Sequence, residues 1–217
     1  DAVVIATGSN VPNDLNINGR DLNGIVYAMD FLTYHQKKLF NKKCKKNNKN
    51  DHIYNTKNKN IIIIGGGDTG TDCIATSLRN NCKSVKNFEI INKPPIKRDK
   101  IYNPWPLFGQ QLKINYGHEE YINKHGEDPR NYSLLTKEFI GDKDNVSYLK
   151  TINVCIENNK MVEVPNSEKI WKADLVILAL GFKHPGLKFN KVLGLNLDNK
   201  NNYHGKNFKT NVEKVFV

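Results

Sequence analysis

The residues best placed to do chemistry lie between positions 61 and 70, where four isoleucines run directly into a glycine-rich turn. The turn reads Gly-Gly-Gly-Asp-Thr-Gly over residues 65–70, a G-x-G-x-x-G pattern that opens a helical segment. In such a pattern Gly65 permits a tight turn, Gly67 lets the backbone approach a pyrophosphate, and Gly70 lets the helix pack closely on the strand. The pyrophosphate then binds to free N–H groups at the helix start. The segment therefore predicts a dinucleotide-binding turn.

We assign all six residues of the turn to cofactor binding: Gly65, Gly66, Gly67, Asp68, Thr69 and Gly70. Two roles are open for Asp68 and Thr69, which either face the surroundings of the phosphates or cap the helix. The alternative for the whole turn is a tight loop in an ordinary α/β sheet.

The flanking segments are those that such a turn requires. Ile61–Ile64 reads as a strand buried on both faces, as in a parallel sheet covered by helices. Residues 71–80 place Ile74 and Leu78 one turn apart on a helix, and residues 84–91 read as a second strand. The three segments complete a βαβ unit, so we predict an α/β fold of the Rossmann type with a parallel sheet.

Glu89 lies near the end of that second strand, where an acidic residue accepts a hydrogen bond from an adenosine ribose 2′-hydroxyl. We therefore expect NADH to be preferred over NADPH. Lys93, Lys97 and Arg98 follow within reach of a 2′-phosphate, so NADPH remains an alternative and Arg98 is included among the cofactor-binding candidates. The alternative for Glu89 is a solvated strand residue.

The formal charge of +11 is concentrated in one part of the chain of 217 residues. Between positions 37 and 60, nine lysines face one acid, Asp51, and the segment is rich in Asn and poor in apolar residues. Such a composition predicts a disordered surface insertion. Because aromatic residues do not alternate regularly with the lysines, as a stacking platform for bases would need, we expect no nucleic-acid partner.

Other chemistry is not favoured by the spacing of the remaining candidate residues. The four cysteines include no C-x-x-C pair, which argues against a dithiol redox centre, an iron–sulfur cluster or a zinc site in this chain. His118-Glu119-Glu120 lacks the second histidine of a metal motif, because position 122 is isoleucine, so we interpret it as a solvated helix start. The sequence contains no run of eighteen apolar residues, so it predicts no membrane span.

Two further strand patterns bracket the βαβ unit. Residues 1–9 and 173–182 are both apolar runs that end on Ala-x-Gly, and the chain opens and closes inside strand-like segments without caps. We therefore expect a piece of a longer protein.

Together these motifs resemble the flavoprotein reductases that bind two dinucleotides, in which a NAD(P)H domain is inserted into an FAD domain. More narrowly, the chain resembles the small-subunit-like region of NADH-dependent glutamate synthase. The segments that carry this resemblance are residues 19–24, 65–73, 87–90, 93–95, 103–106 and 116–120.

The resemblance implies domains at 1–16 (partial FAD-binding), 17–181 (NAD(P)H-binding, with the insertion at 37–60) and 182–217 (partial FAD-binding). It implies cofactor contacts at Thr7, Gly8 and Gly181, with Gly181 near the nicotinamide ring; its alternative role is a turn glycine that ends a strand. The missing FAD motifs would precede Asp1 and follow Val217.

In that family NAD(P)H reduces FAD, and iron–sulfur clusters pass electrons to FMN, where 2-oxoglutarate and glutamine-derived ammonia become glutamate. Hydride transfer needs no protein acid or base, so we expect no catalytic side chain and no metal ligand here. The remaining synthase domains would be the partners, and we expect a cytoplasmic protein. The alternatives are another flavin reductase, such as a dihydropyrimidine-dehydrogenase-like protein, and a non-catalytic interaction module.

Overall fold

The computed structural model describes residues 1–40, 52–158 and 160–217. Contacts divide these residues into two compact units, one formed by Leu15–Ala179 and the other by Asp1–Asp14 with Leu180–Val217. The boundaries expected from the sequence fall two residues further along the chain, at 16/17 and 181/182. The assignment of the smaller unit to FAD stays a prediction.

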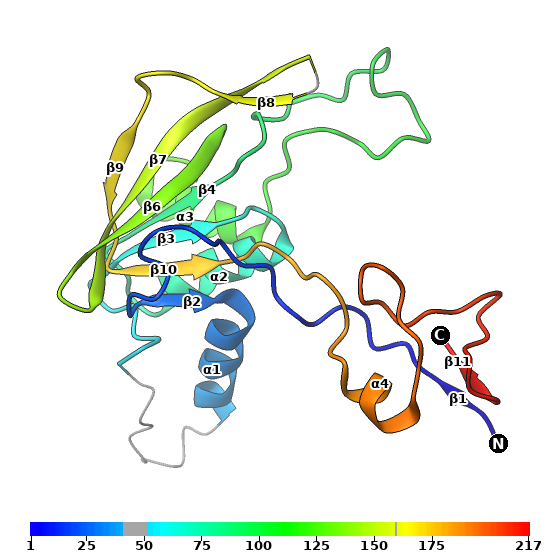
Figure 1. The fold of residues 1–217 in the computed structure, drawn as a ribbon. Helices are drawn as coiled ribbons and strands as arrows, with labels where there is room; N and C mark the ends of the chain where they lie inside the picture. Colours follow the sequence, from blue (N-terminus) through cyan, green and yellow to red (C-terminus); the bar gives the residue numbers. More distant parts are fainter. Residues whose placement is uncertain (41–51, 159) are drawn as a thin grey trace. The chain divides into compact units, whose positions relative to one another are not determined.

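A parallel sheet of five strands forms the centre of the larger unit, in the order β2-β10-β3-β4-β5 (Figure 1). Every neighbouring pair in it is parallel. The strands are β2 (Ile25–Tyr27), β3 (Asn60–Ile64), β4 (Ser84–Phe88), β5 (Arg130–Asn131) and β10 (Leu175–Leu178). The α/β class with a parallel sheet, predicted from the isoleucine run and the glycine turn, is confirmed.

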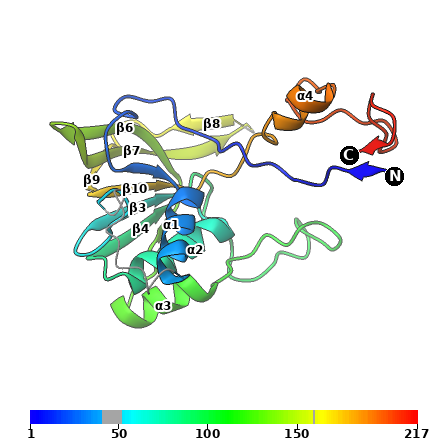
Figure 2. The same cartoon turned by 90° about the horizontal axis from the view of Figure 1, so that it is seen from below.

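Helices cover one face of this sheet and an antiparallel sheet covers the other (Figures 1 and 2). The helices are α1 (Ala28–Phe40), α2 (Asp68–Arg79) and α3 (Tyr116–His125). In the second sheet β6 and β8 flank β7, which also pairs with β9. Its strands are β6 (Leu134–Asp142), β7 (Asn145–Glu157), β8 (Lys160–Glu163) and β9 (Lys169–Lys172).

The isoleucine strand is buried on both faces because its side chains alternate between these two layers. Ile61 and Ile63 pack in the core with apolar residues of the three helices. Ile64 pairs in register with Phe88, and the ring of Phe88 lies 4.9 Å from that of Trp171 in β9. The strand therefore joins the helical layer to the antiparallel sheet.

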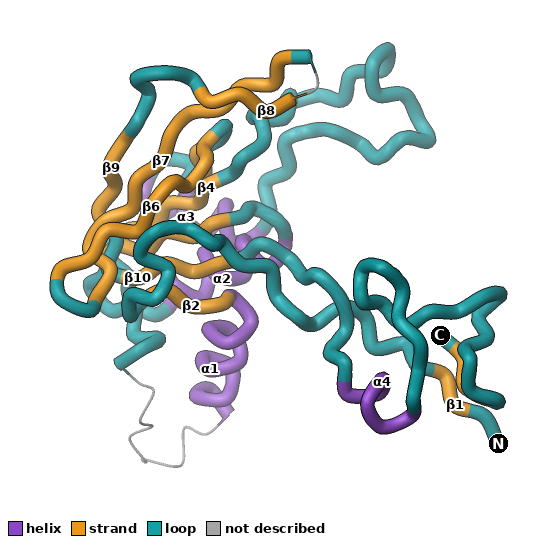
Figure 3. The backbone as a smooth tube through the Cα atoms, viewed as in Figure 1, coloured by secondary structure: helices purple, strands orange, loops and turns teal. Residues whose placement is uncertain are grey.

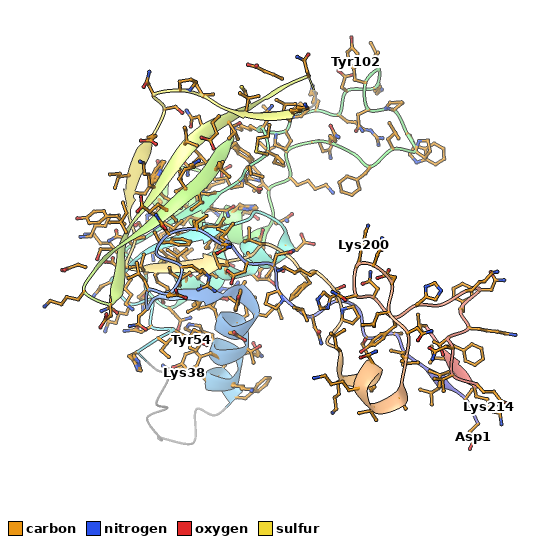
Figure 4. All side chains as sticks on the ribbon, viewed as in Figure 1. Asp1, Lys38, Tyr54, Tyr102, Lys200 and Lys214 are labelled. Carbon is orange, nitrogen blue, oxygen red and sulfur yellow. The ribbon has the colours of Figure 1, made fainter. Side chains whose placement is uncertain are left out.

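The expectation of disorder over residues 37–60 is wrong for the residues of that segment that the structure describes, which exclude 41–51. Lys37 and Lys38 continue α1, and Tyr54 lies against the same helix beside Lys38 (Figure 4). The ring of Tyr54 stacks on Tyr34 at 4.9 Å, and its carbonyl oxygen lies 3.1 Å from His35 Nε2. A few aromatic contacts thus order the residues around Tyr54, although the composition of the surrounding sequence predicts disorder.

The smaller unit has its own apolar centre. Strands β1 (Val3–Val4) and β11 (Val215–Phe216) pair in parallel, and a short helix, α4, spans Lys188–Leu193. Ile5, Leu195, Tyr203 and Val215 form its buried cluster. No helix among the residues described in either unit is long and apolar enough to cross a membrane.

Candidate dinucleotide-binding site

The glycine turn lies between the carboxyl end of β3 and the start of α2, and backbone hydrogen bonds fix it to the neighbouring strand. Gly65 has φ +103°, a conformation that favours glycine, and its N–H donates to the carbonyl oxygen of Phe88 at 2.8 Å. The buried side chain of Asn87 donates from Nδ2 to the carbonyl oxygens of Ile63 and Gly65. The turn is therefore held by β4 as well as by its own strand.

The other three glycines of the turn have different surroundings. A Cβ on Gly70 would lie 2.4 Å from the carbonyl oxygen of Gly65, so this glycine permits the close approach of helix and turn. A Cβ on Gly66 would lie 1.3 Å from Oε1 of Glu89. A Cβ on Gly67 would meet no atom within 4 Å, which leaves an open face at the position where the sequence pattern expects a pyrophosphate.

The first turn of α2 presents N–H groups toward that open face. Gly67 is the N-cap, with an extended backbone (φ −69°, ψ −173°), and no side chain caps the helix. The first intrahelical bond described here runs from Thr71 N–H to the carbonyl oxygen of Gly67 at 3.1 Å. The capping role considered for Asp68 and Thr69 is therefore wrong, and their place near the phosphates stays a prediction. Helix N–H groups without intrahelical acceptors, together with the helix dipole, favour an anion.

Glu89 follows the last residue of β4 and lies over the turn. Its half-buried carboxylate lies directly against the backbone of Gly66, where an added Cβ would lie 1.3 Å from Oε1. Burial raises the pKa of Glu89 above the ordinary glutamate value, and the charge of Arg130 and the backbone N–H of Gly66 oppose that rise. The alternative of a solvated strand residue is wrong, because the side chain is half-buried and follows the end of the strand.

Arg130 is the residue near the site that sequence reasoning missed. Its guanidinium binds the carboxylate of Asp128, with Nη2 to Oδ2 at 2.7 Å, and donates from Nη1 to the carbonyl oxygen of Lys113 at 2.8 Å. It also lies 5.9 Å from the ring centre of Tyr132. The side chain is only 5% exposed, so it places a fixed positive charge beside Glu89. The Asp-Pro-Arg sequence at 128–130 was the available signal, since its acid and base are close enough to pair.

His118 has a structural role at the start of α3. It is buried, and its Nδ1 accepts from the Asn115 N–H at 3.2 Å, while Nε2 lies 3.4 Å from Thr71 Oγ1. Burial lowers its pKa to about 4, and the charge of Arg130 acts in the same direction. The expectation of a helix start is correct, but the expectation that this residue is solvated is wrong. The histidine faces α2 because Gly117 lets the two helices approach closely.

The remaining predicted site residues lie elsewhere. Arg98 is in the segment between β4 and α3, where it donates to the carbonyl oxygens of Asn103 (2.6 Å) and Leu107 (2.7 Å). Thr7, Gly8 and Gly181 belong to the smaller unit, and both glycines have positive φ, +63° and +73°. The structure thus brings the turn and Glu89 together. The cofactor contacts assigned to all of these residues, including the turn and Glu89, stay predictions.

The parallel sheet and the glycine turn are typical of dinucleotide-binding proteins, and comparison with known sequences identifies the family. Residues 1–217 match the family described as pyridine nucleotide-disulphide oxidoreductase, and the chain belongs to this family. It is 41% identical over 225 residues to the glutamate synthase [NADH] of Schizosaccharomyces pombe, which covers 100% of this chain and 10% of that protein. It is 38% identical over 224 residues to the glutamate synthase [NADPH] small chain of Bacillus subtilis, covering 100% of this chain and 44% of that protein.

The resemblance to glutamate synthase inferred from the motifs is thereby confirmed, although the chain spans less than half of either relative. Solved structures agree on the fold. The thioredoxin reductase of T. acidophilum matches with a TM-score of 0.61 at 19% identity, over 99% of this chain and 55% of that one. FprA, an oxidoreductase of Mycobacterium tuberculosis, matches with a TM-score of 0.63 at 13% identity, over 97% and 56%.

Proposed function

We propose that this chain is the NADH-binding part of a glutamate synthase. In the longer protein, hydride from NADH would reach FAD, and electrons would pass through iron–sulfur clusters to FMN for glutamate synthesis from 2-oxoglutarate and glutamine. The observation that carries the proposal is the Glu89 carboxylate placed against Gly66, beside the open face at Gly67. The family membership and the two glutamate synthase relatives support it.

The described residues fit a dinucleotide at this turn. The N–H groups at the start of α2 would hold the pyrophosphate, and Gly67 leaves the space that its approach needs. Glu89 would accept from a ribose 2′-hydroxyl, since its carboxylate lies just beyond the second strand of the βαβ unit. The bound nicotinamide supplies the hydride, so this chain's task is to bind and orient.

Selection of NADH over NADPH would follow from the charge on Glu89. A carboxylate that accepts from a hydroxyl contributes about 1.5–3 kcal/mol, whereas the same carboxylate repels a 2′-phosphate. Because 1.4 kcal/mol is a factor of ten in affinity, we expect NADH to bind at least about ten-fold more tightly than NADPH.

The test is to measure the dissociation constants of NADH and NADPH by calorimetry for the full-length protein and for its Glu89→Gln variant. The variant should lose most of the difference between the two nucleotides, because the amide neither repels the phosphate nor accepts as strongly. Glu119→Gln, on the exposed side of α3, is the matched control and should leave both constants unchanged. Equal affinities in the unaltered protein, or tighter NADPH binding, would refute the role of Glu89.

A cytoplasmic location is part of the same proposal. It is supported by the thiol state of the cysteines, because Cys73, Cys82 and Cys155 are free among the residues that the structure describes.

A further inference from the structure

The segment that joins β4 to α3 is unusually long for a connection that contains neither helix nor strand (Figure 3). We call residues 92–113 the crossover loop. Its two ends are fixed to the sheet edge: Ser133 Oγ donates to Asn92 Oδ1 at 2.7 Å, and Arg130 donates to the carbonyl oxygen of Lys113. A backbone bond from Leu112 N–H to the carbonyl oxygen of Pro95, 2.7 Å long, closes the base of the loop.

Polar side chains form the interior of the crossover loop. Asn103 is buried, donates from Nδ2 to the carbonyl oxygen of Phe108 at 2.9 Å and accepts from the Gln110 N–H at 2.8 Å. Arg98 donates to two carbonyl oxygens on the same turn, as described above. Asp99 accepts from the N–H groups of the residues two and three positions further on. These bonds fix the shape of a loop that has no apolar core of its own.

Large apolar side chains form its exterior, which is the reverse of the usual arrangement. Five of them are between 80% and 86% exposed: Ile96, Ile101, Tyr102, Trp105 and Phe108. Tyr102 lies at the outer end of the loop, away from the glycine turn (Figure 4). We call these five side chains the apolar patch. Large apolar side chains exposed in this way mark an interaction surface, and aromatic residues are the usual anchors of one.

The surroundings of this apolar patch are basic. Lys93, Lys97, Lys100 and Lys113 lie in the crossover loop, whose one acid, Asp99, is engaged with backbone N–H groups. An apolar centre with a positive rim fits a protein surface that is apolar at its centre and acidic at its edge.

We infer that the crossover loop docks onto such a surface on the part of the synthase polypeptide that lies outside this chain. This inference rests on the proposed function, because that function supplies the polypeptide. The 41% identical relative is about ten times longer than the match, which leaves ample protein to carry the complementary surface. The loop begins three residues after Glu89, so a short stretch of chain would join the docked surface to the proposed nucleotide site.

The experiment is hydroxyl-radical footprinting of the full-length protein, read at Tyr102, Trp105 and Phe108 against the same protein unfolded in urea. Docking predicts modification about five-fold slower than in the unfolded protein, because an interface core excludes water. The double substitution Lys97→Glu/Lys100→Glu should restore fast modification by repelling the acidic rim. Lys83→Glu, at an exposed position outside the loop, is the control and should not.

Modification near the unfolded rate in the unaltered protein would overturn the inference, and so would protection that the double substitution leaves intact. Protection that requires added NADH would show that the nucleotide, not a protein surface, covers the loop. NADH binding is titrated in the same samples. A protected loop in a protein that binds no NADH would contradict the proposed function and leave the docking inference standing.

Discussion

The glycine turn allows a prediction that separates folding from cofactor binding at two positions three residues apart. In Gly70→Ala the added Cβ would lie 2.4 Å from the carbonyl oxygen of Gly65. A carbon–oxygen contact relaxes at about 3.3 Å, so α2 must move about 1 Å from the turn. In Gly67→Ala the added Cβ meets no atom within 4 Å, and the extended backbone suits alanine.

The expected magnitudes follow from these contacts. Overpacking against backbone costs about 1–3 kcal/mol, and alanine recovers up to about 1 kcal/mol of helix propensity, so Gly70→Ala should lose about 1–2 kcal/mol of unfolding free energy. For a domain of this size that lowers the melting temperature by about 2–8 °C. Gly67→Ala should change the melting temperature little, because the loss of a glycine N-cap is offset by the lower entropy of the unfolded chain when alanine replaces glycine.

For dinucleotide affinity the two substitutions have the opposite order of effect, with Gly67→Ala the more damaging. The methyl group of Gly67→Ala lies on the face that the pyrophosphate approaches, so NADH affinity should fall by about ten-fold or more, which corresponds to about 1.4 kcal/mol. Thermal unfolding without nucleotide and calorimetric titration with NADH measure the two effects separately. Unchanged NADH affinity in Gly67→Ala would refute the placement of the pyrophosphate, and unchanged stability in Gly70→Ala would refute the close contact.

Three other predictions concern charge and the crossover loop. Because the pKa of His118 is lowered to about 4, the unfolded chain binds a proton at a higher pH than the folded chain does. The free energy of unfolding, measured in urea, should therefore fall by about 3 kcal/mol as the pH drops from 6.5 to 4. The His118→Gln variant should lack this loss. Because burial raises the pKa of Glu89, the carboxylate should become protonated at a pH above the ordinary pKa of glutamate. As the pH falls through this range, the preference for NADH over NADPH, measured by titrating both nucleotides, should weaken. Arg98→Ala removes the hydrogen bonds from the guanidinium to the carbonyl oxygens of Asn103 and Leu107. Limited proteolysis of the folded variant should therefore cut the crossover loop faster than in the unaltered protein. An unchanged rate of cleavage would contradict the role of the guanidinium.

The sequence was sufficient for the centre of the larger unit because local and tertiary signals agree there. Ile61–Ile64 needs cover on two faces, Gly65 needs a positive φ, and Gly70 needs close packing, and each requirement is met in the structure. These requirements depend on neighbours that are close in the chain. A βαβ unit can therefore be recognised from its own residues.

The antiparallel sheet could not be predicted as readily. Its pairings join distant segments, as when Trp171 of β9 lies opposite Leu149 of β7 and against Phe88 of the parallel sheet. The turn at Asp142–Asn145, where Lys143 has a positive φ of 56°, was a local signal for the β6–β7 hairpin. The face that each strand buries depends on the other sheet, which no local pattern specifies.

Tertiary contacts also explain two of the corrected expectations. His118 is polar and begins a helix, which suggests solvent exposure, but the glycine before it brings α2 against the imidazole. Tyr54 lies in a lysine- and asparagine-rich segment, yet one aromatic stack and one carbonyl contact fix it to α1. In both cases a single close contact overrides the average character of the surrounding residues.

The contact between the Glu89 carboxylate and Gly66 means that one side chain covers part of the glycine turn as well as providing a charge. While the carboxylate is present, it fills the space over Gly66 and repels a second negative group. Replacing Glu89 with a small neutral residue would remove the repulsion and at the same time uncover the backbone of Gly66. Gly65 and Asn87 would continue to hold the turn, because their bonds do not involve Glu89. A change of coenzyme could therefore begin with one substitution, without rebuilding the pyrophosphate cradle.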